Sequence, residues 1–174
     1  MRCIVRWPGH VPRGTVEDRV TTMMDILPTA TSICGGDLPS DRIIDGHDMI
    51  DMWFGQTDGE SPYDKTGFFY YYMHQLQAVR SGKWKLYLPL ERKLDNLTGN
   101  LELCSSSEAF LSNVREDPSE NTDFSADYPD VVDRLMGLAA QAREDLGDSA
   151  RPGAHQRKAG WIEHPLLVTD RLSD

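Results

Sequence analysis

The sequence of 174 residues lacks any apolar run of the roughly 18 residues that a membrane-spanning helix needs. Its N-terminus also lacks the basic, apolar and small-residue succession of a signal peptide. Basic residues are few, with 18 Lys and Arg against 28 Asp and Glu and a formal net charge of −10. Because nucleic acid and anionic lipid require a concentrated basic surface, we expect neither partner. Taken alone, the chain is expected to stay in the cytoplasm.

Cysteine is also scarce. Cys3, Cys34 and Cys104 are too few and too scattered for a disulfide framework or a zinc cluster, which need paired or close spacings. We expect all three to be buried as small apolar residues. A glycosylation sequon begins at Asn96, but so short a pattern often occurs by chance, and its use stays open.

Common catalytic motifs are missing from the sequence as well. It contains no phosphate-binding loop, no Gly-X-Ser-X-Gly, no His-Glu-X-X-His and no Gly-X-Gly-X-X-Gly, and its five histidines lie far apart. The nearest approach to a metal pattern is Asp-Gly-His-Asp at residues 45–48. A turn in which Asp45 caps its own backbone explains this tetrad more simply. We therefore predict neither catalytic residues nor a metal site.

What the N-terminal third does contain is one short apolar segment and one amphipathic segment. Residues 3–7 read as a buried strand, although a buried strand needs neighbours on both sides. Apolar residues at spacings of three and four predict a helix over residues 20–34, with Asp25 as a cap, Gly35 as its end and the methionines at 23–24 filling a core. A long connector rich in Gly, Asp and Pro follows, up to residue 67.

The second half predicts an antiparallel sheet of about four strands. The candidate strands are rich in aromatic and β-branched residues, and the pair at 81–82 forms a hairpin turn. They span residues 68–73, 76–80 and 83–88, with weaker candidates at 101–104 and 110–114. Such a sheet needs a cover on one face.

A predicted helix over residues 129–146 supplies this cover, because Val, Leu and Ala form one apolar stripe along it. The fold class is therefore α+β. We predict domain divisions at residues 1–60, 61–147 and 148–174, the last an extended tail that wraps or stays mobile.

Five side chains in the sheet segment are candidates for binding. His74 and Tyr87 are candidates for the rim of a pocket, although an ordinary surface or core position is the simpler explanation for each. The basic residues Arg80, Lys83 and Lys85 could attract an anion, but exposed lysines on strands commonly protect a sheet edge.

Five motifs occur in an order that resembles the C-terminal part of the sulfatase family, the arylsulfatase-like sulfuric ester hydrolases. They are Ile-Val-Arg-Trp-Pro-Gly at 4–9, Met-Asp-Ile-Leu-Pro-Thr at 24–29, Ile-Ile-Asp-Gly-His-Asp at 43–48, Leu-Gln-Ala-Val-Arg-Ser-Gly-Lys-Trp-Lys-Leu at 76–86 and Glu-Asp-Pro-Ser-Glu at 116–120. The resemblance implies an alkaline-phosphatase-like α/β domain, whose terminal strand and helix are present here. A small domain with a four-stranded antiparallel sheet and a packed helix follows it.

This chain lacks the catalytic groups that the resemblance implies. Sulfatases use a formylglycine made from Cys or Ser in a Cys-X-Pro-Ser-Arg type of motif and a divalent cation, usually calcium. No cysteine here is followed by such a motif, and the family's metal ligands lie before the segment that resembles residues 4–9. Without nucleophile and cation, nothing attacks sulfur or neutralises the developing charge on the sulfate oxygens. We therefore expect no sulfatase turnover from this chain alone.

Two hypotheses follow for the function. In the first, the chain is the C-terminal segment of a sulfatase, produced by a split gene, a truncated reading frame or excision of a domain. It supports the fold of a missing N-terminal catalytic domain that binds a sulfate ester, and it forms part of the rim of the substrate pocket. This hypothesis predicts an exposed apolar strand edge and helix face. In the second, the chain is a non-catalytic binding or scaffold module for sulfated glycans, with salt-dependent affinity.

Several properties stay open at this point. They are the substrate, the oligomeric state and the localisation, because sulfatases mostly work outside the cytoplasm whereas no export signal is present here.

Overall fold

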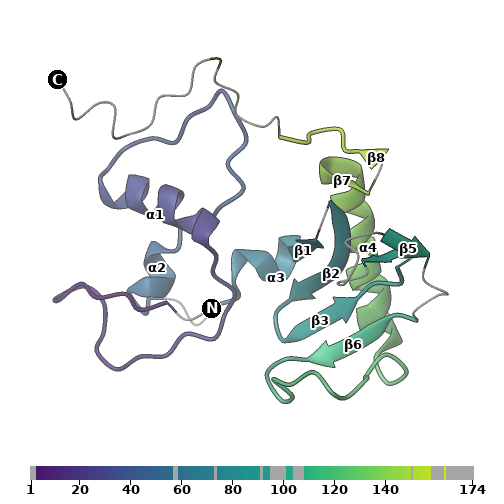
Figure 1. Cartoon of the computed structure of the whole chain (residues 1–174). Helices are drawn as coiled ribbons and strands as arrows, with labels where there is room; N and C mark the ends of the chain where they lie inside the picture. The colour runs from purple at the N-terminus through teal and green to yellow at the C-terminus, as the bar shows by residue number, and fades with distance from the viewer. Residues whose placement is uncertain are drawn as a thin grey trace, which may run out of the picture.

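The computed structural model describes residues 3–56, 59–72, 74–90, 92–94, 101–103, 108–149, 151–157 and 163, with the backbone alone for 92–94 and 101–103. Short helices occupy its N-terminal part, and a sheet with one long helix forms the rest (Figure 1). No helix in the described part of the chain is both long and apolar enough to cross a membrane.

The predicted four-stranded antiparallel sheet is confirmed. Its strands are β1 (Phe68–Tyr72), β2 (Gln75–Ser81), β3 (Trp84–Tyr87) and β6 (Phe110–Asn113), and they lie in the order β1-β2-β3-β6. The prediction that residues 101–104 contribute to this sheet is wrong, because β5 (Leu101–Leu103) pairs with β4 (Arg92–Leu94) in a separate two-stranded ribbon.

The turn between β2 and β3 lies one residue later than predicted. Ser81 still pairs with Trp84, so the turn consists of Gly82 and Lys83. Gly82 has a φ of +59°, in the left-handed region that glycine adopts without steric cost.

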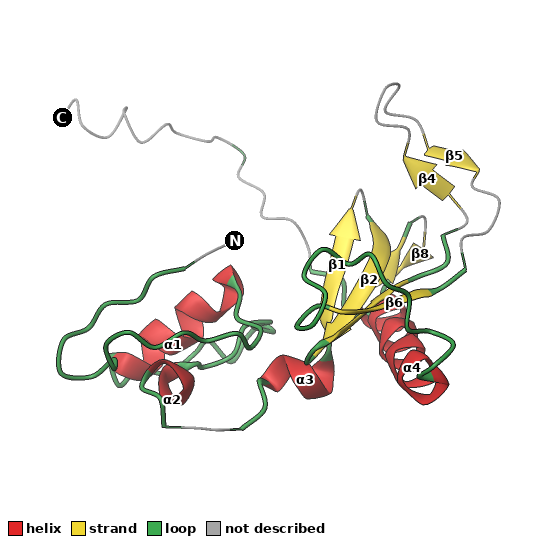
Figure 2. Cartoon of the chain, turned by 90° about the horizontal axis from the view of Figure 1, so that it is seen from below, coloured by secondary structure: helices red, strands yellow, loops and turns green. Residues whose placement is uncertain are grey.

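Alternation along the strands divides the sheet into two faces. One face carries the row Val79, Leu86 and Leu111, which is fully buried and forms a core with Leu135 and Ala139 of α4 (Pro129–Leu146). The other face carries Arg80 opposite Lys85, and Ala78 opposite Tyr87. Figure 2 shows α4 lying against one side of the sheet.

The predicted bounds of α4 agree with the observed ones. Pro129 lies in its first turn, where its missing N–H has no helical partner to lose, and Gly147 follows its end with a φ of +90°. The chain then turns back, since β7 (Gly147–Asp148) pairs with β8 (Arg151–Pro152) and the backbone N–H of Ala154 donates to Glu144 O of α4. The start of the predicted tail therefore packs on the helix.

The strand predicted at residues 3–7 is wrong. These residues are irregular, and the Ile4 side chain is 93% exposed. An apolar segment becomes a strand only where a neighbouring strand accepts and donates its backbone hydrogen bonds, and the described strands pair with one another instead. Cys3 and Cys34 are exposed, contrary to prediction, and Cys104 lies outside the described residues.

The helix predicted over residues 20–34 is shorter than expected. It consists of the 3-10 turn η1 (Met23–Asp25) and α1 (Ile26–Ile33). Asp25 does not cap α1, because its carboxylate accepts a hydrogen bond from Thr22 N and closes a capping box on η1. The two methionines at 23–24 are exposed, so their predicted core role is wrong.

A second, smaller core lies beside α1. Val20, Met49, Met52 and Tyr63 form it. Met52 lies in α2 (Ile50–Trp53), Tyr63 lies in α3 (Pro62–Thr66), and Met49 directly precedes α2. The predicted domain divisions near residues 60 and 147 stay predictions.

A buried carboxylate holds this second core together. Asp25 is 1% exposed and accepts hydrogen bonds from Thr22 N (2.6 Å), His47 N (2.9 Å) and the Tyr63 hydroxyl (2.6 Å). One side chain therefore joins η1, the connector and α3. Asp45, in the connector, accepts a hydrogen bond from Arg157 at 2.5 Å. Residues 45–48 form no turn, so the prediction that Asp45 caps its own backbone in a turn is wrong.

Candidate functional site

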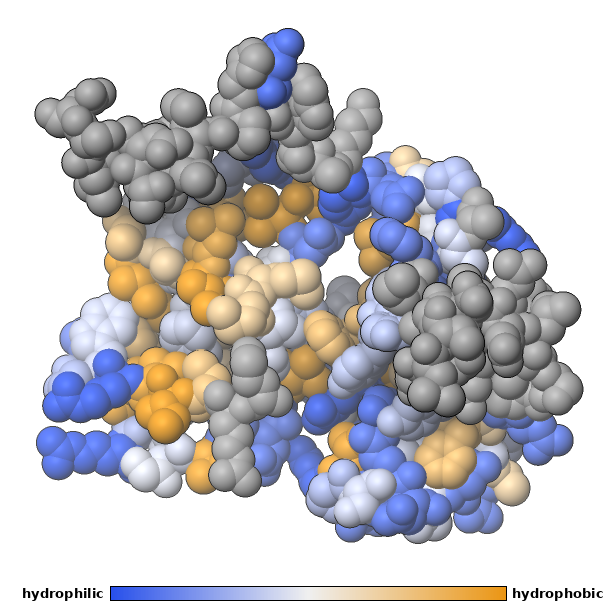
Figure 3. All heavy atoms as spheres, viewed as in Figure 1, coloured by the Kyte–Doolittle hydropathy of each residue, from blue (hydrophilic) through white to orange (hydrophobic). Residues whose placement is uncertain are grey.

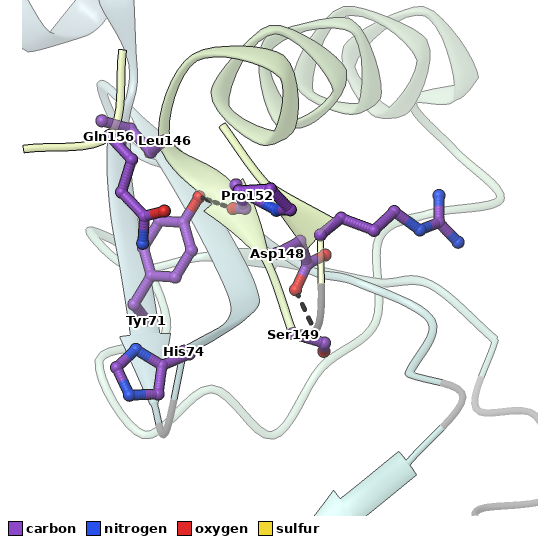
Figure 4. Close-up of a pocket in the computed structure, with 9 residues that line it drawn as sticks. Tyr71, His74, Leu146, Asp148, Ser149, Pro152 and Gln156 are labelled. Carbon is purple, nitrogen blue, oxygen red and sulfur yellow. Dashed lines mark hydrogen bonds between the residues drawn. The ribbon is translucent and has the colours of Figure 1, made fainter. Parts of the chain in front are cut away.

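His74 lies at the edge of a cavity of about 510 Å³ between the β1–β2 connection and the chain that follows α4. Its backbone has a φ of +66°, a conformation that is uncommon for residues other than glycine. Figure 4 shows Tyr71 and His74 on one side of this cavity, with Asp148 and Ser149 facing them from the β7–β8 hairpin. The remaining lining residues are Leu146, Gly147, Arg151, Pro152 and Gln156.

Hydrogen bonds fix the walls of this cavity. The Tyr71 hydroxyl donates to Gly147 O at 2.8 Å, and Ser149 N donates to His74 O at 2.6 Å. Asp148 accepts from Leu76 N at 3.0 Å and from Arg143 Nε at 2.7 Å. Burial, together with the negative charge of Asp148, raises the pKa of Tyr71 to about 12. Tyr71 is therefore a neutral hydrogen-bond donor at neutral pH.

Tyr87 lies in a different group, on the face of the sheet away from α4. Its hydroxyl donates to Glu120 Oε2 at 2.7 Å and accepts from Lys85 Nζ at 2.6 Å. Lys85 Nζ also lies 2.9 Å from Glu120 Oε2 and 5.0 Å from the centre of the Tyr70 ring. The Lys85 and Glu120 side chains are only 14% and 23% exposed, so this ion pair is largely shielded from water.

The network shifts the pKa values of its members. Burial opposes ionisation of Glu120, but hydrogen bonds from Tyr87 and Lys85 outweigh it and lower the pKa of the carboxyl group. Burial likewise opposes the charge of Lys85, but its hydrogen bonds to Tyr87 and Glu120 raise the pKa of the ammonium group. Both groups are therefore charged at neutral pH and are bound to each other.

Arg80 and Lys83 line a second cavity, of about 350 Å³, at the end of the sheet where β2 turns into β3. We call it the basic cavity. Two more cations, Arg19 and Arg115, face it, as do the carboxylates Asp18 and Asp64. The other lining residues are Gly82, Val114 and Pro118.

The structure thus distributes the five predicted binding residues over three places. His74 lines one cavity, Tyr87 and Lys85 share the network with Glu120, and Arg80 and Lys83 line the basic cavity. Their roles as pocket rim and anion contacts stay predictions. Sequence reasoning missed Arg19, Arg115 and Glu120. Only Glu120 carried a signal, since it ends the motif at 116–120.

The residues that the structure describes do not fit a calcium ion or a formylglycine. In the ranges that the structure describes, no group of three or more His, Cys, Asp or Glu side chains is placed to hold a metal. The exposed Cys3 and Cys34 are followed by Ile-Val-Arg and Gly-Gly-Asp, which is not the sequence around a formylglycine precursor. We derive no catalytic step through either group.

Comparison with known proteins identifies the type of chain. Residues 64–164 match the family model described as the C-terminal region of aryl-sulfatase. The chain is 36% identical to human arylsulfatase D over 164 residues, covering 82% of this chain and 27% of the relative. It is 36% identical to N-acetylgalactosamine-6-sulfatase of the dog over 162 residues, covering 82% and 30%. The chain therefore spans less than a third of the length of these relatives.

Solved structures share the fold at lower sequence identity. The crystal structure of Ps i-CgsB superimposes with a TM-score of 0.60 at 18% identity, covering 86% of this chain and 30% of that one. A structure described as a complex with its substrate D-glucosamine-2-N,6-O-disulfate gives a TM-score of 0.55 at 20% identity, covering 80% and 27%.

Proposed function

The chain belongs to the sulfatase family as a C-terminal region, and we propose that it supports a sulfatase catalytic domain through an exposed apolar surface without hydrolysing sulfate esters by itself. The observation that carries this proposal is the apolar surface on η1 and α1. The proposed partner is a catalytic domain that would correspond to the part of the relatives that this chain does not cover.

The apolar surface is unusual for a helix of a soluble protein. Most of α1 is exposed, with only Pro28 and Thr29 buried, whereas such helices normally bury their apolar stripe. Figure 3 shows hydrophobic side chains gathered over the part of the molecule that holds α1 and α2. We call the following residues the α1 surface: Met23 (64% exposed), Met24 (44%), Ile26 (46%), Leu27 (54%) and Ile33 (36%).

The α1 surface can contribute several kcal/mol to an interface. Full burial of a Leu, Ile or Met side chain is worth about 1.5–3 kcal/mol. Leu27 is 54% exposed, so covering the rest of it adds roughly 1 kcal/mol. Burying the five side chains against a partner is therefore more favourable than exposing them to solvent. This agrees with the exposed helix face that the first hypothesis predicts.

The proposed substrate of the assembled enzyme is a sulfate ester. The names of the relatives support this class, since they include arylsulfatase, steryl-sulfatase and N-acetylgalactosamine-6-sulfatase. In the assembled enzyme, His74 and Tyr87 are proposed as rim residues of the substrate pocket. His74 is the better placed of the two, because it lines a cavity, whereas the Tyr87 hydroxyl is bound to Lys85 and Glu120.

Turnover of a chromogenic aryl sulfate in the presence of calcium tests the absence of activity. The purified chain is expected to release no more product than a mock purification from the same host. Sulfatase activity that co-elutes with the chain on a second chromatography column would contradict the proposal.

Size-exclusion chromatography with light scattering tests the apolar surface. The wild-type chain is expected to self-associate, and Leu27→Glu combined with Met24→Glu is expected to restore a monomer, because the charges replace apolar contacts. Val16→Glu is the matched control, since Val16 is 86% exposed but lies outside the α1 surface. A monomeric wild type, or equal rescue by the control, would refute the role of α1.

A further inference from the structure

We propose that the basic cavity binds a tetrahedral oxyanion, either free sulfate or phosphate or the sulfate or phosphate group of a monoester. The cavity lies between residues 18–19, α3, the β2–β3 turn and the end of β6. This inference goes beyond the proposed function and does not depend on it.

The charge of the cavity is opposite to that of the chain. Four cationic side chains and two carboxylates line it, whereas the whole chain carries a formal net charge of −10. A cluster of cations on an acidic protein is stabilised by an anion that occupies it, because like charges at short range repel. Arginine guanidinium groups match the oxygens of sulfate and phosphate by paired hydrogen bonds.

The Asp64 carboxylate is already engaged by backbone donors. Asp64 Oδ1 accepts from Gly82 N at 2.8 Å, and Oδ2 accepts from Ser61 N at 3.0 Å, so both oxygens hold the β2–β3 turn and the start of α3. Its structural role explains its position beside the cations. Asp64 is therefore a fixed wall of the cavity.

Two of the cations are positioned by the surrounding chain. Arg80 Nε donates to Gly82 O at 3.1 Å, across the β2–β3 turn. Arg19 Nε donates to Glu17 at 2.8 Å, and Arg19 Nη1 donates to Gly59 O at 2.6 Å. Preorganised side chains lose less conformational entropy when a ligand binds.

The other two cations have charge available for a ligand. Lys83 Nζ lies 3.6 Å from Glu116 Oε1, and these side chains are 41% and 66% exposed, so the pair is loose and open to water. Arg115 forms no ion pair with any carboxylate among the residues that the structure describes. By contrast, Lys85 is bound to Glu120 and lies outside the cavity lining.

The cavity volume restricts the ligand to a small group. About 350 Å³ lies at the lower end of the range of roughly 300–1,000 Å³ for ligand sites. This volume suits a small ligand such as an oxyanion or a sugar monoester.

Isothermal titration calorimetry of the full chain at constant ionic strength tests the site. The probes are inorganic sulfate, inorganic phosphate, glucose 6-sulfate and glucose 6-phosphate, with chloride as the background anion. At least one probe is expected to bind saturably to a single site. Chloride, the background anion, is expected to compete with the probe and to lower its apparent affinity. Tighter binding of the sugar esters identifies an esterified ligand, and tighter binding of the inorganic ions identifies a free anion.

Variants localise the binding. Lys83→Gln combined with Arg115→Gln is expected to weaken it at least tenfold. Arg115→Lys keeps the charge but loses the paired hydrogen bonds, so it is expected to weaken binding by less than the double variant. Arg42→Gln removes one positive charge from an exposed ion pair outside the cavity and is expected to have no effect. Absence of saturable binding for all four probes, or an equal loss in Arg42→Gln, would overturn the proposal.

Discussion

Replacing Asp25 with alanine should strongly destabilise the N-terminal part of the protein. The carboxylate is 1% exposed and accepts three hydrogen bonds, from Thr22 N, His47 N and the Tyr63 hydroxyl. Each hydrogen bond to a charged group contributes about 1.5–3 kcal/mol, and each abandoned buried donor costs about 1–3 kcal/mol. Asp25→Ala is therefore expected to lower the free energy of unfolding by at least about 4.5 kcal/mol.

A second variant separates the contribution of Tyr63 from that of the backbone donors. Tyr63→Phe removes one of the three hydrogen bonds and is expected to cost about 1.5 kcal/mol. The Tyr63 hydroxyl also lies 3.1 Å from Thr22 Oγ1. Burial and the hydrogen bond to Asp25 raise the pKa of Tyr63, so the hydroxyl donates throughout the neutral range. A double-mutant cycle should give a coupling of about 1–2 kcal/mol.

Urea unfolding followed by tryptophan fluorescence measures these effects, because Trp53 packs against the core that Asp25 holds together. Asp41→Ala is the control, since Asp41 forms an exposed ion pair with Arg42 and should unfold like the wild type. If Asp25→Ala lowered stability by no more than Asp41→Ala, or if Asp25 and Tyr63 showed no coupling, the reasoning about this buried network would be refuted.

Two further predictions concern a glycine and an ion pair. Gly46→Ala would place a Cβ 2.0 Å from Met24 O, so we expect the free energy of unfolding, measured by thermal denaturation, to fall by about 3 kcal/mol or more. In Gly137→Ala, the added Cβ on α4 meets no atom within 4 Å, so the free energy of unfolding should rise by up to about 1 kcal/mol. A neutral Gly46→Ala would contradict the close approach. Because the folded-state pKa of Glu120 is lowered from 4.5, its stabilising contribution is present above that value and is lost as pH falls through the lowered pKa. Glu120→Gln should therefore reduce the loss of the free energy of unfolding as the pH falls into this acidic range. If the loss were the same in Glu120→Gln and the wild type, the role of the network would be contradicted.

Segments with strong local periodicity could be predicted from the sequence. The bounds of α4 follow from its apolar stripe, its early proline and its terminal glycine, which all act within a few residues. The strands β2 and β3 follow from their composition and from the turn glycine between them. The order of the five motifs also predicted the family, which the match at residues 64–164 confirms.

The errors came from interactions between distant parts of the chain. Residues 3–7 have the composition of a strand, but strand formation depends on a partner that local sequence cannot supply. The methionines at 23–24 fit a helical stripe, but whether a stripe is buried depends on what packs against it. Likewise, Lys85 was grouped with Arg80 and Lys83, whereas its partner Glu120 lies 35 residues away and on another segment.

Co-purification tests the central claim most directly. The chain would be co-expressed with the catalytic part of a sulfatase, such as the dog N-acetylgalactosamine-6-sulfatase cut before its aligned segment. The wild-type chain is predicted to co-purify in equimolar amount and to restore turnover, the Met24→Glu and Leu27→Glu double variant to do neither, and Val16→Glu to behave like the wild type. Failure of the wild type to bind, or equal binding by the double variant, would contradict the account.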